Sequence, residues 1–248
     1  MTRRPCLTGL VRAPAIIILF GSILISGCAT QVGLQDGTEQ SAARAYTELG
    51  VAYLERDNLR RAMSALDRAL EADPDAAEAL QAMAMVYQRQ GEERLADETF
   101  QRALAADPSL TRARNNYAAF LYDRGRIREA CQQLEQASGD TQYPNRAQLF
   151  ANLGQCQREL GDLDAARTSL ARAQAIDPRS PRSYFTLAEI EHARGNHASA
   201  QDQLQTYMRL AGPNVAAVRL ARDIARAQGD QASAAFYSEQ LDNTRGDP

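Results

Sequence analysis

From residue 43 onward, large apolar residues and small residues return at the same places in successive windows of 34 residues. Within each window the apolar positions keep the spacing of one helix face, in two groups separated by polar residues. The first window carries the pattern at Tyr46, Leu49, Gly50, Tyr53, Ala62, Leu66, Ala69 and Pro74. The second repeats it at Leu80, Met83, Ala84, Tyr87, Ala96, Phe100, Ala103 and Pro108. Each window therefore predicts two amphipathic helices, and the chain predicts an all-α fold.

Residues that interrupt helices keep the same register. Glycines stand at 91, 125, 161, 195 and 229, spaced 34 apart with one spacing of 36. Glycine supplies the positive φ that ends the first helix of a window, and a proline later in the window ends the second. Asp57 and Asn58 replace the glycine in the first window, because Asn and Asp tolerate the same backbone. About six units result, 43–76, 77–110, 111–146, 147–180, 181–214 and 215–244, and the last has few large residues, as a capping unit does.

This 34-residue signature resembles the tetratricopeptide repeat, or TPR. The resemblance implies a TPR superhelix over residues 43–244, an α-solenoid in which each unit buries one face on its neighbours. The first helices of such units line a concave groove, the usual place for an extended peptide or a partner helix. Aromatic residues and methionines at repeat positions are therefore expected in the core rather than around a cofactor.

The first 27 residues have the parts of a secretory signal. Three arginines precede an apolar run of 11 residues, 15–25, which is too short for a bilayer that needs roughly 20. The run ends in Leu24-Ile25-Ser26-Gly27-Cys28, which resembles the lipobox of bacterial lipoproteins. That resemblance implies cleavage before Cys28 and acylation of its thiol, and Ala29 implies sorting to the outer membrane. The alternative is an ordinary secretory signal followed by a chance cysteine.

Residues 28–42 are polar and rich in Gly, Gln and Thr, which predicts a flexible linker after a lipidated Cys28. Removing residues 1–27 takes away three of the 28 basic residues and leaves 25 against 31 acidic ones, a net charge of −6. All basic residues are arginines, and they alternate with acidic residues along the chain. This pattern gives no basic patch, so nucleic acid is not expected as a partner, and acyl chains rather than charge would hold the protein at a membrane.

Two adjacent amides, Asn115 and Asn116, interrupt the third unit beside its buried stripe. Asn152 stands in the next unit at the position of Asn116, so two groove-facing amides one repeat apart form a short ladder. An amide has donors and an acceptor that suit the backbone of an extended peptide. The remaining predicted groove residues of these central units are Met85, Gln88, Ala119, Tyr122 and Gln155. The alternative is that the asparagines bond a neighbouring helix and bind no partner.

A narrower resemblance rests on residues 114–156. The run Asn115 to Tyr122 (NNYAAFLY), followed by Gly125-Arg126 and Glu129-Ala130, is similar to the NNYG-x-FLC…GR…EA run of the PilF/PilW family. Tyr143-Pro144 and Asn152 to Cys156 (NLGQC) resemble that family's Y-P…N-x-G-x-C. Ala118 stands for the family's glycine and Tyr122 for its cysteine. Members are outer-membrane lipoproteins of type IV pilus biogenesis that help the secretin pore assemble and that stabilise pili.

Cys131 and Cys156 remain once Cys6 leaves with the signal and Cys28 is acylated. They lie in consecutive antiparallel helices, and the midpoint between them falls in the Tyr143-Pro144 turn. Residues equidistant from such a turn sit at the same height, so a disulfide is allowed if their Cβ atoms face each other. We expect it to form in an oxidising periplasm. The alternative is two buried free thiols.

Nothing in the chain points to catalysis or a metal. The two histidines, His192 and His197, are five residues apart and are not expected to share a helix face as a metal-binding pair would. No phosphate-binding loop or nucleophile elbow occurs, so no cofactor and no enzyme activity are expected. The resemblance implies a TPR scaffold, a pilotin for the pilus secretin or a binder of other pilus assembly proteins. The alternative is a general outer-membrane TPR lipoprotein that docks a cell-wall enzyme or another envelope factor.

Overall fold

The computed structural model describes residues 29–243, with the backbone alone for residues 29–37, and the described part is helical throughout without a strand. Residues 1–27 and Cys28 lie outside the described residues. By internal contacts the chain divides into residues 1–38 and 39–248. The helices are α1 (Ala29–Glu55), α2 (Leu59–Ala72), α3 (Ala77–Gln90), α4 (Glu93–Ala106), α5 (Thr111–Asp123), α6 (Ile127–Ala137), α7 (Arg146–Glu159), α8 (Leu163–Ile176), α9 (Pro181–Ala193), α10 (His197–Ala211), α11 (Val215–Gln228) and α12 (Gln231–Asn243).

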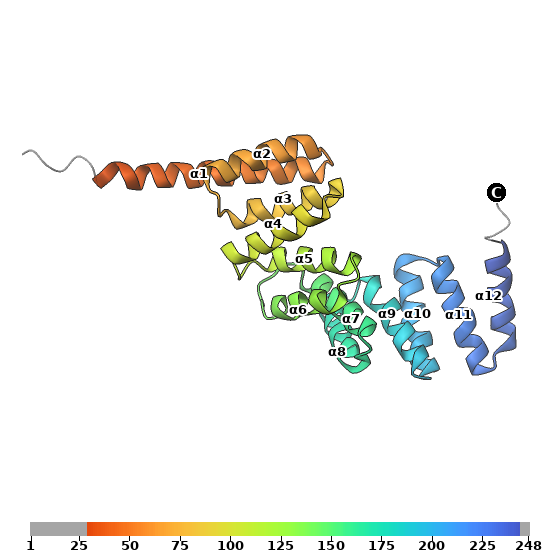
Figure 1. Cartoon of the computed structure of the whole chain (residues 1–248). Coiled ribbons are helices and arrows are strands. Elements are labelled where there is room, and N and C mark those ends of the chain that lie inside the picture. The colour runs from red at the N-terminus through yellow and green to blue at the C-terminus, as the bar shows by residue number, and fades with distance from the viewer. Residues whose placement is uncertain (1–28, 244–248) are drawn as a thin grey trace, which may run out of the picture. The chain divides into compact units, whose positions relative to one another are not determined.

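Within residues 39–243 the helices form hairpins that stack in chain order (Figure 1). From the second repeat on, each second helix packs on its own first helix, and α2, α4, α6, α8 and α10 each pack on the first helix of the next repeat. The first helices also contact each other directly, α3 with α5, α5 with α7, α7 with α9 and α9 with α11. The predicted TPR superhelix of about six repeats is therefore confirmed.

The turn inside each repeat has the backbone that the sequence predicts. Gly91, Gly125, Gly161, Gly195 and Gly229 have φ between 72° and 81°. Asp57 takes their place in the first repeat with φ 57°, and it is the one non-glycine residue with positive φ among those described. The chain can reverse there because this left-handed conformation ends a helix and turns it back.

Small residues occur where two helices of a repeat come closest. The repeating alanine of the second helix is fully buried at Ala62, Ala96, Ala130, Ala166 and Ala200. A Cβ on Gly154 would lie 2.5 Å from Cγ of Leu170, and one on Gly50 would lie 2.6 Å from Cγ of Leu66. A larger residue at either position would push the two helices apart, because the interior is close-packed.

The first repeat departs from the pattern at Leu49. The equivalent residues Met83, Tyr117 and Leu153 are buried against the preceding repeat, whereas Leu49 is 43% exposed. No described helix precedes α1, so this position has no repeat to pack against. Position within the stack, rather than residue type, decides its burial.

Over residues 29–42 the structure has a helix where the sequence predicts a flexible linker, and Cys28 lies outside the described residues. Helix α1 begins at Ala29 and runs without a break into the first repeat. The segment contains no proline, and extending an existing helix costs much less than nucleating one. Its glycines, Gly33 and Gly37, lower helix propensity without ending the helix.

Candidate functional site

Three first helices, α5, α7 and α9, line two adjoining recesses. One recess of about 140 Å³ is lined in part by Tyr122, Asn152 and Gln155. The next, of about 460 Å³, is lined in part by Arg158 and Phe185. Gln155 and Arg182 line both recesses, and we call the pair the α5–α9 groove. Its floor comes from consecutive repeats because their first helices contact each other along the stack.

Amide side chains connect α5 to α7. Asn152 donates from Nδ2 to Oδ1 of Asn115 over 3.2 Å, and its own Oδ1 accepts from Nε2 of Gln148 over 2.8 Å. All three side chains come from adjacent repeats, and Asn115 and Asn152 are half-buried. Asn115, rather than Asn116, is the partner of Asn152, so these two amides bond each other across neighbouring helices, which is the alternative that the sequence leaves open. Binding of a peptide by this pair stays a prediction.

Asn116 contacts the preceding repeat instead. Its Nδ2 lies 3.3 Å from Sδ of Met85, which also accepts from Nε2 of Gln81 over 2.8 Å. Sulfur is a weak acceptor, and Met85 packs against the cores of two neighbouring repeats. Asn116 and Met85 therefore meet at the α3–α5 junction. Neither they nor the half-buried Gln88 on α3 line the two recesses. Binding by these three predicted residues stays a prediction.

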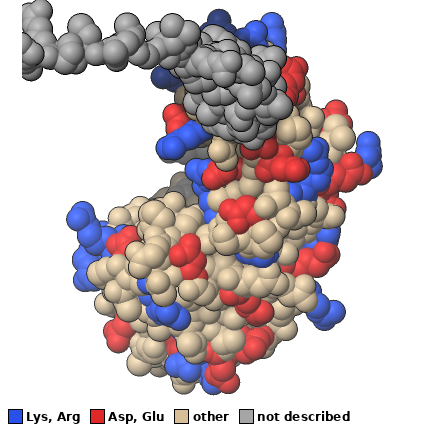
Figure 2. Space-filling model, turned by 90° about the vertical axis from the view of Figure 1, so that its left-hand side faces the viewer, with Lys and Arg blue, Asp and Glu red and all other residues tan. Residues whose placement is uncertain are grey.

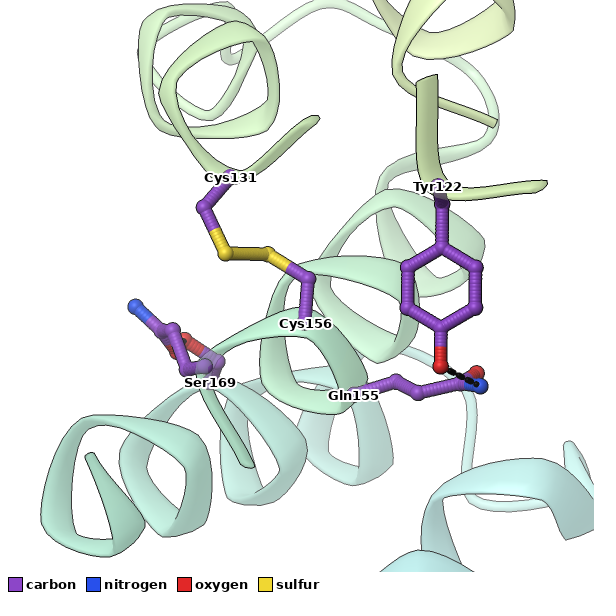
Figure 3. Close-up of a disulfide and its surroundings, with 6 residues drawn as sticks. Tyr122, Cys131, Gln155, Cys156 and Ser169 are labelled. Atoms are coloured by element: carbon purple, nitrogen blue, oxygen red, sulfur yellow. Dashed lines mark hydrogen bonds between the residues drawn. A yellow bond between two sulfur atoms is a disulfide. The ribbon is translucent and has the colours of Figure 1, made fainter. Parts of the chain in front are cut away.

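A chain of polar groups crosses the groove floor from α5 to α9. Gln155 donates from Nε2 to the hydroxyl of Tyr122 over 2.9 Å (Figure 3). The Oε1 of Gln155 accepts in turn from Nη2 of Arg182. Ala119, one turn before Tyr122, is exposed in the same recess. The predicted residues Ala119, Tyr122, Asn152 and Gln155 are thus brought together.

An ion-pair network lies beside this chain. Arg158 contacts Glu159 at 2.8 Å and also pairs with Glu189. Burial raises the pKa of Glu189, and the charge of Arg158 offsets that rise only in part. Burial would lower the pKa of Arg158, but its two carboxylate partners outweigh burial and raise it. Arg158 therefore stays charged, with its charge met by neighbours within the protein.

An aromatic pair forms the far wall of the groove. The rings of Phe185 on α9 and Tyr207 on α10 lie with centroids 5.0 Å apart at 48°. Asn214 donates from Nδ2 to the hydroxyl of Tyr207 over 2.6 Å, which holds that ring in place. The sequence reasoning missed Arg182 and Phe185. Phe185 occupies the helix position of Asn115 two repeats further on, so extending that position would have found it, and Arg182 lies three residues before it on the same helix.

A disulfide joins the third and fourth repeats directly behind the groove. Cys131 on α6 and Cys156 on α7 are bonded, with their Cα atoms 5.7 Å apart, and both are buried. In Figure 3 the bond and the Tyr122–Gln155 contact lie on different sides of α7, since Gln155 and Cys156 are neighbours that point apart. The bond therefore fixes the helix that supplies Asn152 and Gln155.

The two histidines are closer than the sequence led us to expect. The Nδ1 atoms of His192 and His197 lie 3.2 Å apart, because the turn at Gly195 folds α10 back onto α9. His192 lies in the last turn of α9 and His197 begins α10, so they share no helix face, and the turn between the two helices brings them together. No group of three or more His, Cys, Asp or Glu side chains able to hold a metal occurs in the part of the chain that the structure describes.

Charge is mixed over the surface. Acidic and basic side chains are interspersed with uncharged ones on the face seen in Figure 2, which also has a hollow at one side. Within residues 29–243, no helix combines the length and the apolar character that a membrane span requires.

The stacked hairpins define a tetratricopeptide repeat protein, and family models of the tetratricopeptide repeat match residues 43–86, 77–110 and 121–181. The chain is 33% identical over 235 residues to the type IV pilus assembly protein PilF of Pseudomonas aeruginosa PAO1, covering 93% of this chain and 92% of that protein. The solved structure of P. aeruginosa PilF matches with a TM-score of 0.77, covering 85% of this chain and 95% of that chain at 33% identity. PilW, a widely conserved type IV pilus biogenesis factor, matches with a TM-score of 0.71 and 27% identity, covering 80% and 91%. The chain therefore belongs to the PilF/PilW family of type IV pilus biogenesis proteins, as the resemblance in residues 114–156 indicates.

Proposed function

We propose that this protein is a non-catalytic scaffold that acts as the pilotin of the type IV pilus secretin. It promotes the localisation and assembly of the secretin at the outer membrane by binding a segment of it. The observation that carries this proposal is the likeness to PilF over 93% of the chain. The α5–α9 groove supplies a surface of the kind on which TPR proteins bind peptides.

The proposal includes a lipid anchor on Cys28, which lies outside the described residues. The lipobox-like run ending at Cys28 supports it. Acyl chains on this residue would hold the stack at the periplasmic face of the outer membrane, where a secretin is assembled. A second acyl chain matters because a single one gives only reversible binding.

A deletion strain tests the scaffold role. We expect that strain to lose detergent-resistant secretin multimers and twitching motility, and we expect the wild-type chain to restore both. Normal multimers and motility in the deletion strain would contradict the pilotin role and favour the docking of another envelope factor.

Cys28→Ser tests the anchor in the same strain. We expect this variant to leave the outer-membrane fraction and to incorporate no labelled palmitate. Cys6→Ser is the matched control, since it removes a thiol from the expected signal segment without touching the acylation site. Retention of Cys28→Ser in the outer membrane would contradict the anchor.

A further inference from the structure

We infer that Arg182 and Phe185 form a subsite in the α5–α9 groove for an extended peptide with a carboxylate and a bulky apolar side chain two residues apart. The inference rests on the proposed function, because it describes how the groove takes its partner.

The charge in the groove favours an acidic group. Arg158 is neutralised by Glu159 and Glu189, whereas no ion pair among the described residues involves Arg182, whose hydrogen-bond partner is the neutral Gln155. A guanidinium has five N–H donors, so most of those on Arg182 are free for a ligand. The side chain is exposed in both recesses. A carboxylate is the group that a planar guanidinium binds best.

The aromatic wall favours an apolar side chain beside that carboxylate. Phe185 and Tyr207 are only partly buried, and the recess they line is about 460 Å³ and open. Pro181 and Ala211 add further apolar surface to it. A leucine-sized or phenylalanine-sized side chain placed there would leave water and cover the rings, which stabilises a complex.

The spacing of the two groups sets the spacing in the ligand. Arg182 and Phe185 are three residues apart on α9, which places their Cβ atoms roughly 5–6 Å apart on one helix face. In an extended peptide, residues two apart point to the same side and are separated by roughly 6.5 Å. An acidic and an apolar residue with one residue between them therefore match the subsite.

The amides of the groove favour an extended ligand over a helical one. Asn152 and Gln155 lie on the floor of the adjoining recess. One N–H and one oxygen lone pair of each amide are engaged within the protein, so the second N–H and lone pair of each can meet backbone C=O and N–H groups. An extended peptide leaves those groups unpaired, whereas a helix satisfies them internally.

The test uses the full-length protein in detergent and a fluorescein-labelled Ser/Gly peptide that contains Asp-Ser-Phe, followed by fluorescence anisotropy. We expect saturable binding, weakened about fivefold or more when Asp becomes Asn or Phe becomes Ala, since each change removes one anchor. Arg182→Gln should weaken binding of the Asp-containing peptide by a similar factor. It should not further weaken binding of the peptide in which Asn replaces Asp. This non-additivity distinguishes a direct contact from a general loss of charge.

Arg179→Gln is the matched control, because it removes the same charge from an exposed position outside both recesses. Phe185→Leu, checked by circular dichroism, tests the aromatic wall without emptying it. Three results would overturn the inference. Arg179→Gln could weaken peptide binding as much as Arg182→Gln does, or the losses from Arg182→Gln and from the Asp-to-Asn peptide could add. The peptide could also fail to bind at about 1 mM protein, a concentration at which even weak complexes form. Tighter binding of an Ala-rich helical peptide with Asp and Phe three residues apart would overturn it as well.

The same variants separate this inference from the proposed function. In cells, Arg182→Gln is expected to reduce secretin multimers several-fold while Arg179→Gln leaves them unchanged. Normal multimers with Arg182→Gln, in a species where deletion abolishes them, would reject the subsite and leave the pilotin role standing. Normal multimers in the deletion strain would reject the pilotin role, and the peptide titration would then decide the subsite by itself.

Discussion

At the residue scale, a few backbone positions control the chain reversals. Gly125 has φ 72°, and apart from its chain neighbours no atom lies within 4 Å of where a Cβ would stand. The cost of replacing it is therefore backbone strain rather than a clash. Asp57, with φ 57°, shows that a short polar side chain can adopt this conformation at the same place in a repeat.

We expect Gly125→Ala to lower the free energy of unfolding by about 1 kcal/mol, the cost of the left-handed backbone for an L-residue. Gly125→Asn should lower it less, because Asn adopts this conformation more readily. Urea denaturation followed by circular dichroism measures both. Equal stability of the Ala variant and the wild type would contradict the account of the turn.

Asp140 connects the loop after α6 to the start of α5. Its Oδ2 accepts from the hydroxyl of Thr111 over 2.7 Å, and its Oδ1 accepts from the backbone N–H of Gln142 over 2.9 Å. The Thr111 bond is the main cause that lowers the pKa of Asp140 below its ordinary value. Stability from this bond is present at neutral pH and is lost as the pH falls through the folded-state pKa.

We expect Thr111→Val to raise the pKa of Asp140 toward its ordinary value, since Val keeps the shape and removes the donor. A carbon-detected NMR titration of the carboxyl group measures it. Below neutral pH, the free energy of unfolding should also fall less steeply with decreasing pH in the variant than in the wild type. An unchanged pKa would show that the backbone N–H groups of the loop, rather than Thr111, hold the carboxylate.

At the element scale, the disulfide joins α6 to α7, the second helix of one repeat to the first helix of the next. It closes a loop over a sequence separation of 25. Such a loop restricts the unfolded chain, and the chain-entropy estimate for this length is about 3.5 kcal/mol. The same bond holds α7, which carries Asn152 and Gln155, against the third repeat.

We expect reductant to lower the urea midpoint of the wild-type protein and to leave that of Cys131→Ala with Cys156→Ala unchanged. Without reductant, the double variant should have a urea midpoint close to that of the reduced wild-type protein. Any remaining difference reflects the two truncated side chains. Mass spectrometry without reductant measures the thiol content directly. Two free thiols in the purified protein would contradict the bond.

At the scale of the whole molecule, the repeats are not equally supported. The largest core cluster extends from α3 to α8 and includes both bonded cysteines. At the end of the described stack, α12 packs on α11, and its Phe236 is 55% exposed. In a solenoid each repeat is stabilised by its neighbours, so terminal repeats open more easily than central ones.

Native-state hydrogen exchange should therefore be slowest in α5 to α7 and fastest in α12, because local opening follows local packing. Reduction of the disulfide should accelerate exchange in α6 and α7 more than in α9 to α11. Uniform exchange over all repeats would indicate that the stack opens as one cooperative unit.

Sequence reasoning predicted the repeats well because each carries the same local requirements. Buried alanines, positive-φ glycines and paired helices occur at the predicted register. The α5–α9 groove was predicted only in part. Tyr122, Asn152 and Gln155 line it, but Arg182 and Phe185 come from a repeat that looked unremarkable, and Asn116 contacts Met85 outside the recesses. Which amide meets which neighbour depends on how far one repeat is rotated on the next.

By itself the amino-acid sequence determined the helices, their turns and the family, since periodicity and residue size act within one repeat and recur along the chain. The tertiary structure alone decided which side chains meet across repeats. It left Leu49 exposed, placed His192 against His197 and gave Arg158 carboxylate partners while Arg182 has an amide. These outcomes depend on contacts between helices that stack in space, and a side chain's place within its own helix does not specify them.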